Sequence, residues 1–340
     1  MRPPAPRGPI SARVLRCLEE GTTLPASPSD ATAMTRVQDP LGDDDFHLAL
    51  WVLYELHFRG FDAVDPAREW DVGLLAHRAE LEAVFEDALR CATRDAVADA
   101  HESTDDVVEQ IRHLIAADDG PDVARYVHRE ATVAQFRELM MQRSVYTLKE
   151  ADPSSFVLPR LDGPVKAALA ELQYDEYGGG RPERLHATLF ARALAGCGLD
   201  PTYGAYVDQA PGRTLAVNNA ASYFGLHRRL RGAALGHLAT FEATSSLPCR
   251  RVAAGIRRLE LGDAVWDYFD EHVEADAVHE EVALRSICAV AVAAEPELRH
   301  DILFGSAACL LLESAAGTAL LDSWRAGRSS LHESGERLPA

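Results

Sequence analysis

The stretch that decides the fold runs from Tyr268 to His279 and reads YFDEHVEADAVH. Each residue of an α-helix turns by about 100°, so Asp276 lies about 40° from His272 around the axis and His279 about 20° from it on the other side. One helix face therefore carries two imidazoles and a carboxylate, while the other acids of the stretch lie on other sides. Such a stripe is typical of side chains that hold metal inside a helical bundle. An ordinary polar helix face is the alternative, and this stretch alone leaves it open.

The sequence on both sides of this stretch has the apolar spacing of long amphipathic helices. Short breaks that contain Gly or Pro separate the helices, and breaks of this length place consecutive helices antiparallel in a bundle. Strand signals are almost absent, because the sequence has no alternating run of β-branched residues and no Asn-Gly hairpin turn. The predicted class is therefore all-α. The helices of the C-terminal half are predicted near residues 164–178, 182–196, 201–210, 216–246, 249–260, 263–293 and 296–327.

The N-terminal part of the chain divides into two predicted regions. Residues 1–40 are rich in Pro, Ser and Thr without clear periodicity, and they are predicted to form an irregular arm. From Asp43 on, apolar residues recur every three or four positions. Residues 41–150 are therefore predicted to be accessory helices wrapped against a bundle of residues 151–328. Residues 329–340 are expected to form a short tail.

Composition restricts the function classes. The net charge of −19 argues against nucleic-acid binding, which needs clustered Lys and Arg, and it disfavours an anionic membrane surface. The six cysteines form no CxxC pair, which is typical of reduced thiols. The sequence has no signal-peptide pattern and no apolar run near the roughly 20 residues that span a bilayer. The protein is expected in the cytoplasm, with neither nucleic acid nor a membrane as its partner.

A second candidate metal ligand is Glu242, the only charged residue between positions 232 and 247. An unpaired buried carboxylate is costly, so Glu242 needs a partner, and a metal ion is the simplest one. Pairing with Arg231 is the alternative. Arg231 precedes Glu242 on the same helix face and is also a candidate to bind a substrate carboxylate, although a structural salt bridge is the simpler role.

The third source of ligands is the pair Glu176 and His186, which flank three successive glycines at positions 178–180. Ten residues of ideal helix would leave the two side chains about 80° apart around the axis. Each glycine inside a helix costs about 1 kcal/mol relative to alanine, so this run favours a backbone shaped for a purpose. A break or wide turn at the glycines would bring both side chains onto one face. A plain turn between helices is the alternative.

Taken in order, these motifs resemble the haem-oxygenase-like dimetal oxidase family, whose members are known as iron-containing redox enzymes. The motifs are an acid and a histidine around a gap, a lone Glu on the next helix, and His-x3-Asp-x2-His on the third. The resemblance covers roughly residues 145–325. It implies a haem-oxygenase-like helical bundle with an N-terminal helical extension, as a homodimer. The ligands that it implies are Glu176, His186, Glu242, His272, Asp276 and His279.

The same resemblance implies how the ligands divide between two irons. His186, Glu242 and His272 would serve one ion, and Glu176, Asp276 and His279 the other, with one carboxylate bridging. Members that oxygenate nitrogen have a further Glu about 26 residues before the first of these ligands, and Glu150 stands at that position. A surface acid at a helix end is the alternative for Glu150.

The function implied is O2-dependent oxidation of a small amino-acid-like or amine metabolite by two ferrous ions, with manganese as the alternative metal. Three imidazoles with three or four carboxylates suit iron or manganese better than structural zinc. N-oxygenation in specialised-metabolite biosynthesis is the leading reaction because of Glu150. Desaturation or C–C cleavage of an amino acid is the alternative, and an external electron donor is a further expected partner. Haem binding and a metal-free helical binding protein are the competing classes.

Overall fold

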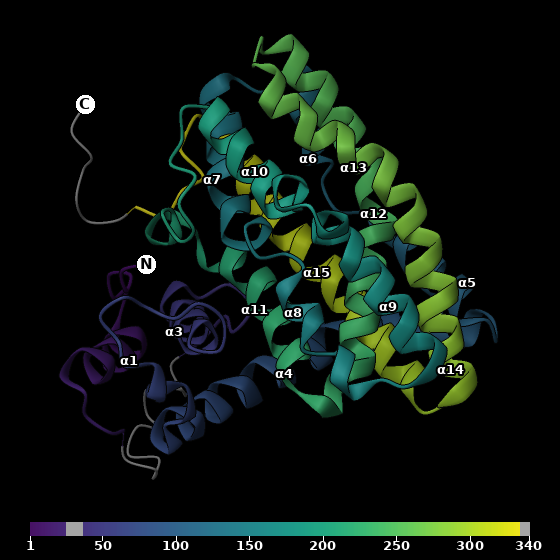
Figure 1. Cartoon of the computed structure of the whole chain (residues 1–340), viewed down its shortest axis with the longest axis horizontal. Coiled ribbons are helices and arrows are strands. Elements are labelled where there is room, and N and C mark those ends of the chain that lie inside the picture. The colour runs from purple at the N-terminus through teal and green to yellow at the C-terminus, as the bar shows by residue number, and fades with distance from the viewer. Residues whose placement is uncertain (25–36, 334–340) are drawn as a thin grey trace.

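The computed structural model describes residues 1–24 and 37–333, except the side chains of residues 274–277. Within these ranges every helix or strand assigned is a helix, which confirms the all-α prediction (Figure 1). The N-terminal helices are α1 (Pro9–Glu20), α3 (Asp44–Glu55), α4 (Val72–Ser103), α5 (Val107–Ala117), α6 (Val123–Arg129), α7 (Val133–Thr147) and α8 (Asp152–Ser155). The C-terminal helices are α9 (Gly163–Glu176), α10 (His186–Gly196), α11 (Gly212–Leu226), α12 (Arg231–Arg258), α13 (Asp263–Glu281), the π-helix η7 (Val282–Ala289), α14 (Val290–Ala294) and α15 (Leu298–Arg325).

The first helix corrects the prediction that residues 1–40 form an irregular arm. α1 begins with Pro9 at its first position, where the missing N–H costs nothing, and it ends at Gly21, whose φ of 64° is left-handed. Its apolar face, which includes Val14 and Leu18, is buried in the same core as α3. The prediction is therefore wrong for this part of the arm, because the frequent prolines of the region concealed a helix that one proline starts.

Three helices predicted in the C-terminal half, at 201–210, 216–246 and 249–260, differ from the structure. The helix predicted at 216–246 is interrupted by a short 3-10 turn, and its second part, α12, continues through Pro248. α12 packs against both α13 and α6 there, so tertiary packing outweighs the hydrogen bond that a proline removes. The segment 201–210, predicted as helical, contains only the 3-10 turn Val207–Gln209.

The centre of the bundle is the contact between α12 and α15, where two glycines allow the backbones to meet. A Cβ atom on Gly236 would lie only 1.9 Å from the carbonyl oxygen of Ile302, and one on Gly305 only 1.9 Å from that of Ala233. Any larger residue would push the two helices apart. This close approach fixes where α12 lies in the bundle, and α13 packs along its other side (Figure 1).

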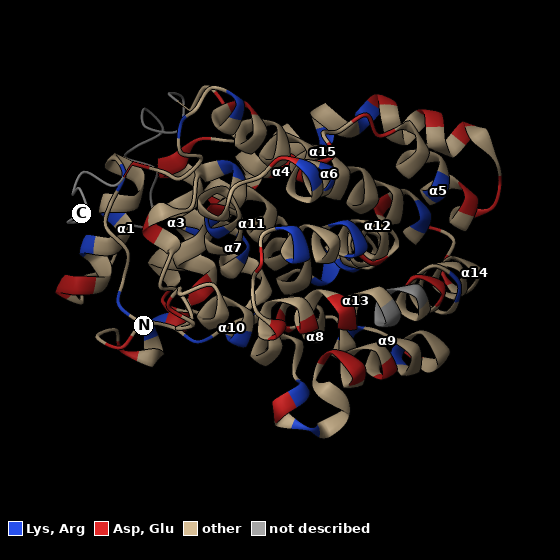
Figure 2. Cartoon of the chain, turned by 90° about the horizontal axis from the view of Figure 1, so that it is seen from above, with Lys and Arg blue, Asp and Glu red and all other residues tan. Residues whose placement is uncertain are grey.

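α15 is the one described helix that is long and apolar enough to cross a membrane, with a mean hydropathy of 1.5 over its most apolar window. Half of that window is buried against the rest of the protein. The central helix of a bundle passes the same test, because it is apolar on most of its circumference. Residues with charges of both signs are interspersed along the helices (Figure 2).

The accessory helix α3 is joined to the bundle by a buried ion pair. Lys149 Nζ lies 3.0 Å from Glu55 Oε2, and neither side chain is exposed to solvent. The hydroxyl of Tyr203 donates to the same carboxylate oxygen at 2.6 Å. Lys149 also lies 4.1 Å from the centre of the Phe58 ring. A charge in such apolar surroundings depends on its partner, so this pair fixes the turn after α7 to α3.

We expect Glu55→Gln to lower the free energy of unfolding by about 3–5 kcal/mol, because it leaves Lys149 charged and buried without a counter-charge. Gln keeps the size of Glu but replaces one acceptor oxygen by an NH2 donor, so the change removes the charge and one of the two acceptors. The measurement is equilibrium unfolding in urea.

The matched control is Glu109→Gln, which breaks the exposed pair with Arg112, an ion pair of 2.8 Å on one helix. It should cost about 0.5 kcal/mol or less. Equal effects of the two substitutions would show that the buried pair does not stabilise the fold.

Candidate metal centre

His272 is held by its own helix in an orientation that directs Nε2 of its ring toward Glu150. Its Nδ1 lies 2.7 Å from the carbonyl oxygen of Tyr268, one turn earlier on α13. A proton on Nδ1 makes this a hydrogen bond and leaves Nε2 as the acceptor. Histidine ligands commonly have their second nitrogen fixed in this way.

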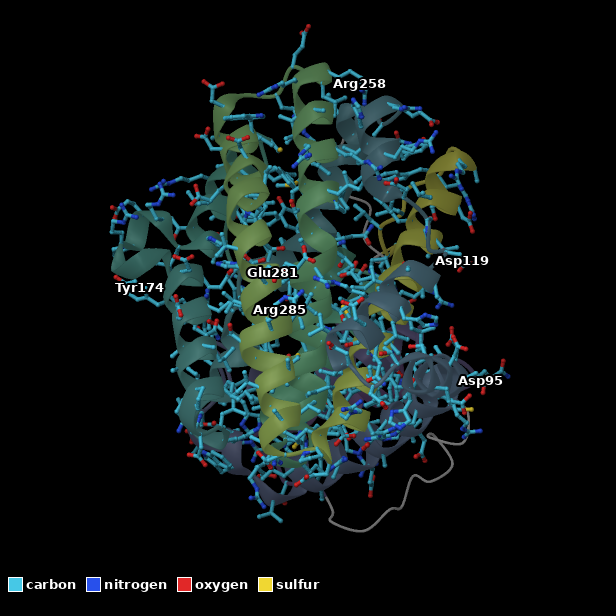
Figure 3. All side chains as sticks on the ribbon, turned by 90° about the vertical axis from the view of Figure 1, so that its right-hand side faces the viewer. Asp95, Asp119, Tyr174, Arg258, Glu281 and Arg285 are labelled. Carbon is cyan, nitrogen blue, oxygen red and sulfur yellow. The ribbon has the colours of Figure 1, made fainter. Side chains whose placement is uncertain are left out.

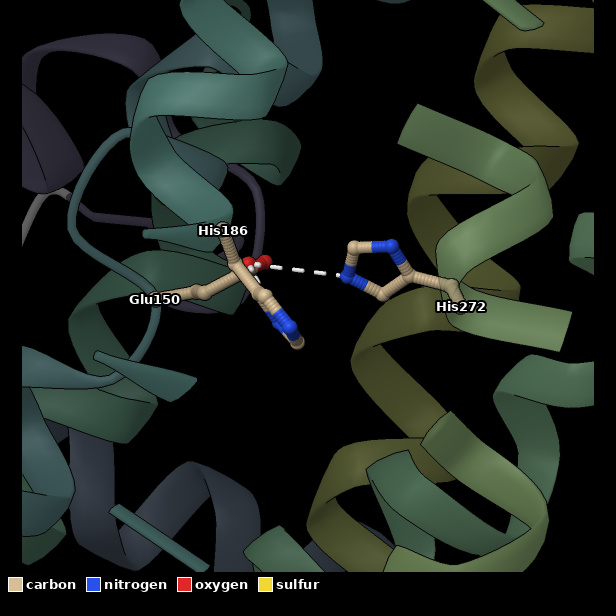
Figure 4. A group of neighbouring side chains, drawn as sticks. All are labelled: Glu150, His186 and His272. Carbon is tan, nitrogen blue, oxygen red and sulfur yellow. Dashed lines mark ion pairs between the residues drawn. The ribbon is translucent and has the colours of Figure 1, made fainter. Parts of the chain in front are cut away.

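The first ligand group consists of Glu150, His186 and His272, whose ligand atoms all lie within 4.8 Å of one another. Glu150 follows α7 in a turn, and His186 is the first residue of α10. Oε1 of Glu150 lies 4.0 Å from His186 Nδ1 and 3.8 Å from His272 Nε2. Figure 4 shows the three side chains pointing toward one another from three separate elements. The separations are long for direct hydrogen bonds and leave space for an ion between the groups.

The second ligand group consists of Glu176, Glu242 and His279, also within 4.8 Å of one another and all buried. His279 Nδ1 lies 3.3 Å from Glu176 Oε1 and 3.5 Å from Glu242 Oε2. Its other nitrogen, Nε2, lies 3.2 Å from Asp175 Oδ2. A carboxylate behind a histidine ligand orients the ring and raises its basicity. Asp175 was not predicted from the sequence, where its only signal is its place next to Glu176.

The two groups adjoin each other through Glu176 and His186. Oε2 of Glu176 lies 2.9 Å from His186 Nδ1, and the other oxygen of the same carboxylate faces the second group. The rings of His186 and His279 have centroids 6.4 Å apart. Glu176 thus has one oxygen toward each group, as a carboxylate that bridges two ions would.

The structure divides the residues differently from the predicted split. Glu242 lies with Glu176 and His279, not with His186 and His272, and Glu150 takes its place in the first group. The predicted split is wrong because it depends on the offset between neighbouring helices, which spacing within one helix does not give. The structure therefore brings six of the seven predicted ligands together. The seventh, Asp276, lies on α13, but its side chain is outside the described residues.

The three glycines form the break that the sequence predicts between Glu176 and His186. α9 ends at Glu176, and Gly178, Gly179 and Gly180 follow with φ of 72°, 60° and 78°. Only glycine adopts this left-handed conformation readily in three successive residues. Gly178 also lies against the backbone of Arg184, where a Cβ would be 2.6 Å from its carbonyl carbon. The turn therefore returns the chain so that α10 begins at His186, beside the end of α9.

The second ligand group holds protons because its buried carboxylates require a positive charge nearby. Burial alone would lower the pKa of His279, but Glu176 and Glu242 outweigh it and raise that pKa to about 11. Burial alone would likewise raise the pKa of Glu176, yet His186 and His279 hold it well below its ordinary value. The pKa of Glu242 is raised, mainly by burial. In the metal-free protein, protons therefore provide the positive charge that the carboxylates require.

Buried polar atoms without hydrogen-bond partners show what kind of group the site fits. Glu150 Oε1, His186 Nδ1 and His279 Nδ1 are buried without a hydrogen-bond partner, although a carboxylate faces each imidazole nitrogen. The contacts are close, but their directions do not suit hydrogen bonds, and ligands that converge on a common ion have this arrangement. Three imidazoles and three carboxylates without a thiolate suit iron or manganese. The two clusters fit a dimetal site.

The helix that carries His272 and His279 changes its winding directly after the second histidine. α13 passes into the π-helix η7 at Val282, near the labelled side chains of Glu281 and Arg285 in Figure 3. π-helical turns are rare and often accompany functional sites, because an extra residue in a turn shifts the side chains that follow. Here the shift comes after His279, so the stripe predicted from α-helical spacing is preserved.

Arg231, the candidate substrate-binding residue, forms a salt bridge away from the two ligand groups. Its guanidinium pairs with the carboxylate of Glu295, which lies between α14 and α15. It stands at the first position of α12, about 16 Å along the helix from Glu242 at 1.5 Å per residue. The structure therefore shows the structural salt bridge that was the simpler role for Arg231.

Comparison with known proteins identifies the family. The profile of a family described as iron-containing redox enzyme matches residues 137–314. The chain belongs to this family of haem-oxygenase-like helical proteins. It is therefore an oxidoreductase, and the match includes all seven predicted ligands.

Two individual proteins are similar to the chain. Nitrosourea synthase from Streptomyces achromogenes subsp. streptozoticus is 31% identical over 141 residues, which are 41% of this chain and 30% of that protein. The chain thus matches less than a third of the length of this curated relative. The crystal structure of a CADD-like protein of unknown function from Nostoc punctiforme has a TM-score of 0.51 and 18% identity, and the match covers 64% of this chain and 96% of that one. At this identity the second likeness supports the fold alone.

We expect the metal-free protein to bind about two divalent ions per chain, because each group offers at least three ligand atoms. His279→Ala should reduce this to about one, since it removes the imidazole of the second group. Dialysis against Co(II) followed by elemental analysis measures the number. His113→Ala is the control, because His113 also pairs with a carboxylate, Asp99 at 2.7 Å, outside the site. An unchanged number in His279→Ala would exclude His279 as a ligand.

Metal binding near neutral pH should also release protons. His279 is protonated there because its pKa is raised to about 11, and an imidazole must be neutral to bind a metal ion. A pH-indicator dye in weakly buffered solution measures the release. His279→Ala should release fewer protons per ion bound than the His113→Ala control, and equal release would contradict the protonated state of His279.

Proposed function

We propose that this protein is a dinuclear non-haem iron oxygenase that inserts one oxygen atom of O2 at a nitrogen of a small amine or amino-acid-like metabolite. The observation that carries the proposal is the convergence of Glu150 with His186 and His272. It adds a third described carboxylate to a site that already has three imidazoles. The matched relative supports the choice of reaction, because its name, nitrosourea synthase, denotes a product with an oxidised nitrogen.

When bound as ferrous ions, the metal pair supplies two electrons, so that with two protons one oxygen atom enters the N–H bond, the other leaves as water, and an external electron donor restores the ferrous state. Glu150, Glu176 and Glu242 would hold the ions together with the three imidazoles and would neutralise most of their charge. The carbonyl of Tyr268 and the carboxylate of Asp175 fix the rings of His272 and His279. Most of the described ligand side chains are buried, and this burial largely excludes water from the reacting atoms.

Desaturation or C–C cleavage of an amino acid is the alternative reaction of the same centre. Glu150 distinguishes between the two in this proposal, because the extra carboxylate is what resembles the nitrogen-oxygenating members. Haem binding would require one axial histidine and an apolar pocket, and it would leave three buried carboxylates without partners. A metal-free binding protein would leave the same carboxylates unexplained.

The decisive experiment loads the protein anaerobically with Fe(II), adds isotopically labelled oxygen, and screens amino acids and their decarboxylated amines by mass spectrometry. The expected product gains a single oxygen-18 atom attached to nitrogen. A product that has lost two hydrogens, or carbon dioxide, would replace the proposed reaction by one of its alternatives. Binding of less than about one iron per chain would exclude the dinuclear centre itself.

Glu150→Ala should lower the rate of N-oxygenation about 100-fold or more. Loss of a residue that only supports a metal ligand lowers activity by up to about 100-fold, and Glu150 is proposed to be a ligand itself. Glu150→Asp should retain part of the activity, since it keeps the carboxylate on a shorter side chain. Glu130→Ala is the control, because Glu130 is an exposed acid that follows a helix, α6, outside the site. Initial rates at saturating substrate measure the effect, and full activity of Glu150→Ala would make Glu150 a bystander.

A further inference from the structure

A small cavity adjoins the first ligand group at Glu150. Glu150 forms one wall, and Tyr146 on α7, Ser154 on α8, Ala221 on α11, and His237 and Leu238 on α12 form much of the rest. The space would hold about one or two water molecules. It therefore has room for a small polar head group of a substrate, and it lies next to Glu150, a candidate metal ligand.

His237 is the most informative residue of this cavity. It is almost fully buried, and Nε2 has no hydrogen-bond partner. The ring meets Phe224 edge-on, with centroids 6.0 Å apart. Burial lowers the pKa of His237 to about 4, so the imidazole is neutral at physiological pH. An unpaired buried polar atom costs about 1–3 kcal/mol, so a bound partner is expected there.

Further unpaired polar groups continue from the cavity along α11. Asn218 and Ser222 are completely buried, and both have side-chain atoms without a hydrogen-bond partner. Asn218 lies three residues before Ala221 and Ser222 three before Gly225, and both of these later residues line the cavity. Residues three apart share a helix face. Polar side chains of α11 thus continue past the residues that line the cavity.

The charges around the cavity determine which chemical group fits it. Among the described residues that line it, none is Lys or Arg. A substrate carboxylate would therefore have no cation to pair with, and it would face Glu150. Tyr146 keeps its proton, because burial and then Glu150 raise its pKa well above the ordinary value. Neutral His237, Ser154 and the Glu150 carboxylate all offer acceptor atoms, which suit a group that is rich in N–H donors.

We propose that this cavity binds the nitrogen-bearing head group of the substrate and that His237 accepts a hydrogen bond from its N–H. The inference rests on the proposed function and names the part of the substrate that the site recognises. His237 and Glu150 lie on different walls, so a nitrogen held between them is beside the first ligand group. If the substrate is an amino acid, its carboxylate must then lie outside this cavity.

The test uses the full chain loaded with Zn(II), which is redox-inactive, and two probes of similar size, propylamine and propionate. Ring nitrogens of His237 are followed by NMR and assigned by their absence in His237→Gln. Propylamine should shift the His237 signals, and propionate should bind at least about tenfold more weakly. His237 signals that stay unchanged with propylamine, or a preference for propionate, would overturn the proposal.

Variants then test the role of the imidazole itself, with ligand-observed NMR as the readout. His237→Leu should weaken propylamine binding about tenfold, while His237→Gln should retain most of it because its amide still accepts a hydrogen bond. The control is His47→Gln, since His47 is also buried and neutral but already paired with the carbonyl of Pro40 at 2.9 Å. Equal affinity of His237→Leu and the wild type would overturn the role of His237.

The outcomes separate this inference from the proposed function. If propylamine binds through His237 but the iron-loaded protein oxidises no amine, the proposed reaction fails and the cavity assignment stands. If oxygen-18 enters a nitrogen product but His237→Leu leaves the KM of that substrate unchanged, the reaction stands and the cavity assignment fails.

Discussion

The structure is organised around three carboxylates and three imidazoles that are buried within contact distance of one another. In the described part of the chain none of these carboxylates pairs with Lys or Arg, so the fold itself does not neutralise them. Placing such groups in a low-dielectric interior is unfavourable unless positive charge arrives from outside. Without metal, the histidines take up protons in that role. The helices that contribute ligands are also held by contacts elsewhere in the bundle.

Two of these external contacts fix the position of α12. Gly236 and Gly305 let it approach α15 at backbone distance, and α13 packs on its other side. α12 then presents Glu242 to the second ligand group and, five residues earlier, His237 to the cavity beside the first. A single helix thus sets the distance between a candidate metal ligand and the imidazole that we propose to receive the substrate. Catalytic geometry that depends on ångström-scale placement is best carried by an element of this kind.

The sequence was sufficient wherever function follows a local period. The stripe from His272 to His279 and the all-α class were predictable because helical spacing is fixed by the backbone. The glycine turn was predictable as a break, since three glycines are costly in a helix, although its left-handed geometry was not. Asp175 and the division of the ligands depend on offsets between helices, which no spacing within one segment encodes. α1 was missed because proline is read as a breaker even where it begins a helix.

The buried pair of Glu55 and Lys149 limits how this protein can be divided. The family match begins at residue 137, so it includes Lys149 but not α3, which supplies the counter-charge. A fragment cut at the start of the match would lose both the carboxylate and the Phe58 ring that Lys149 contacts, directly beside Glu150 in sequence. Such a core is not modular: transplanting it into another protein requires either α3 as well or an apolar residue in place of Lys149. In this chain a buried ion pair thus joins an accessory helix to the core that the family match covers.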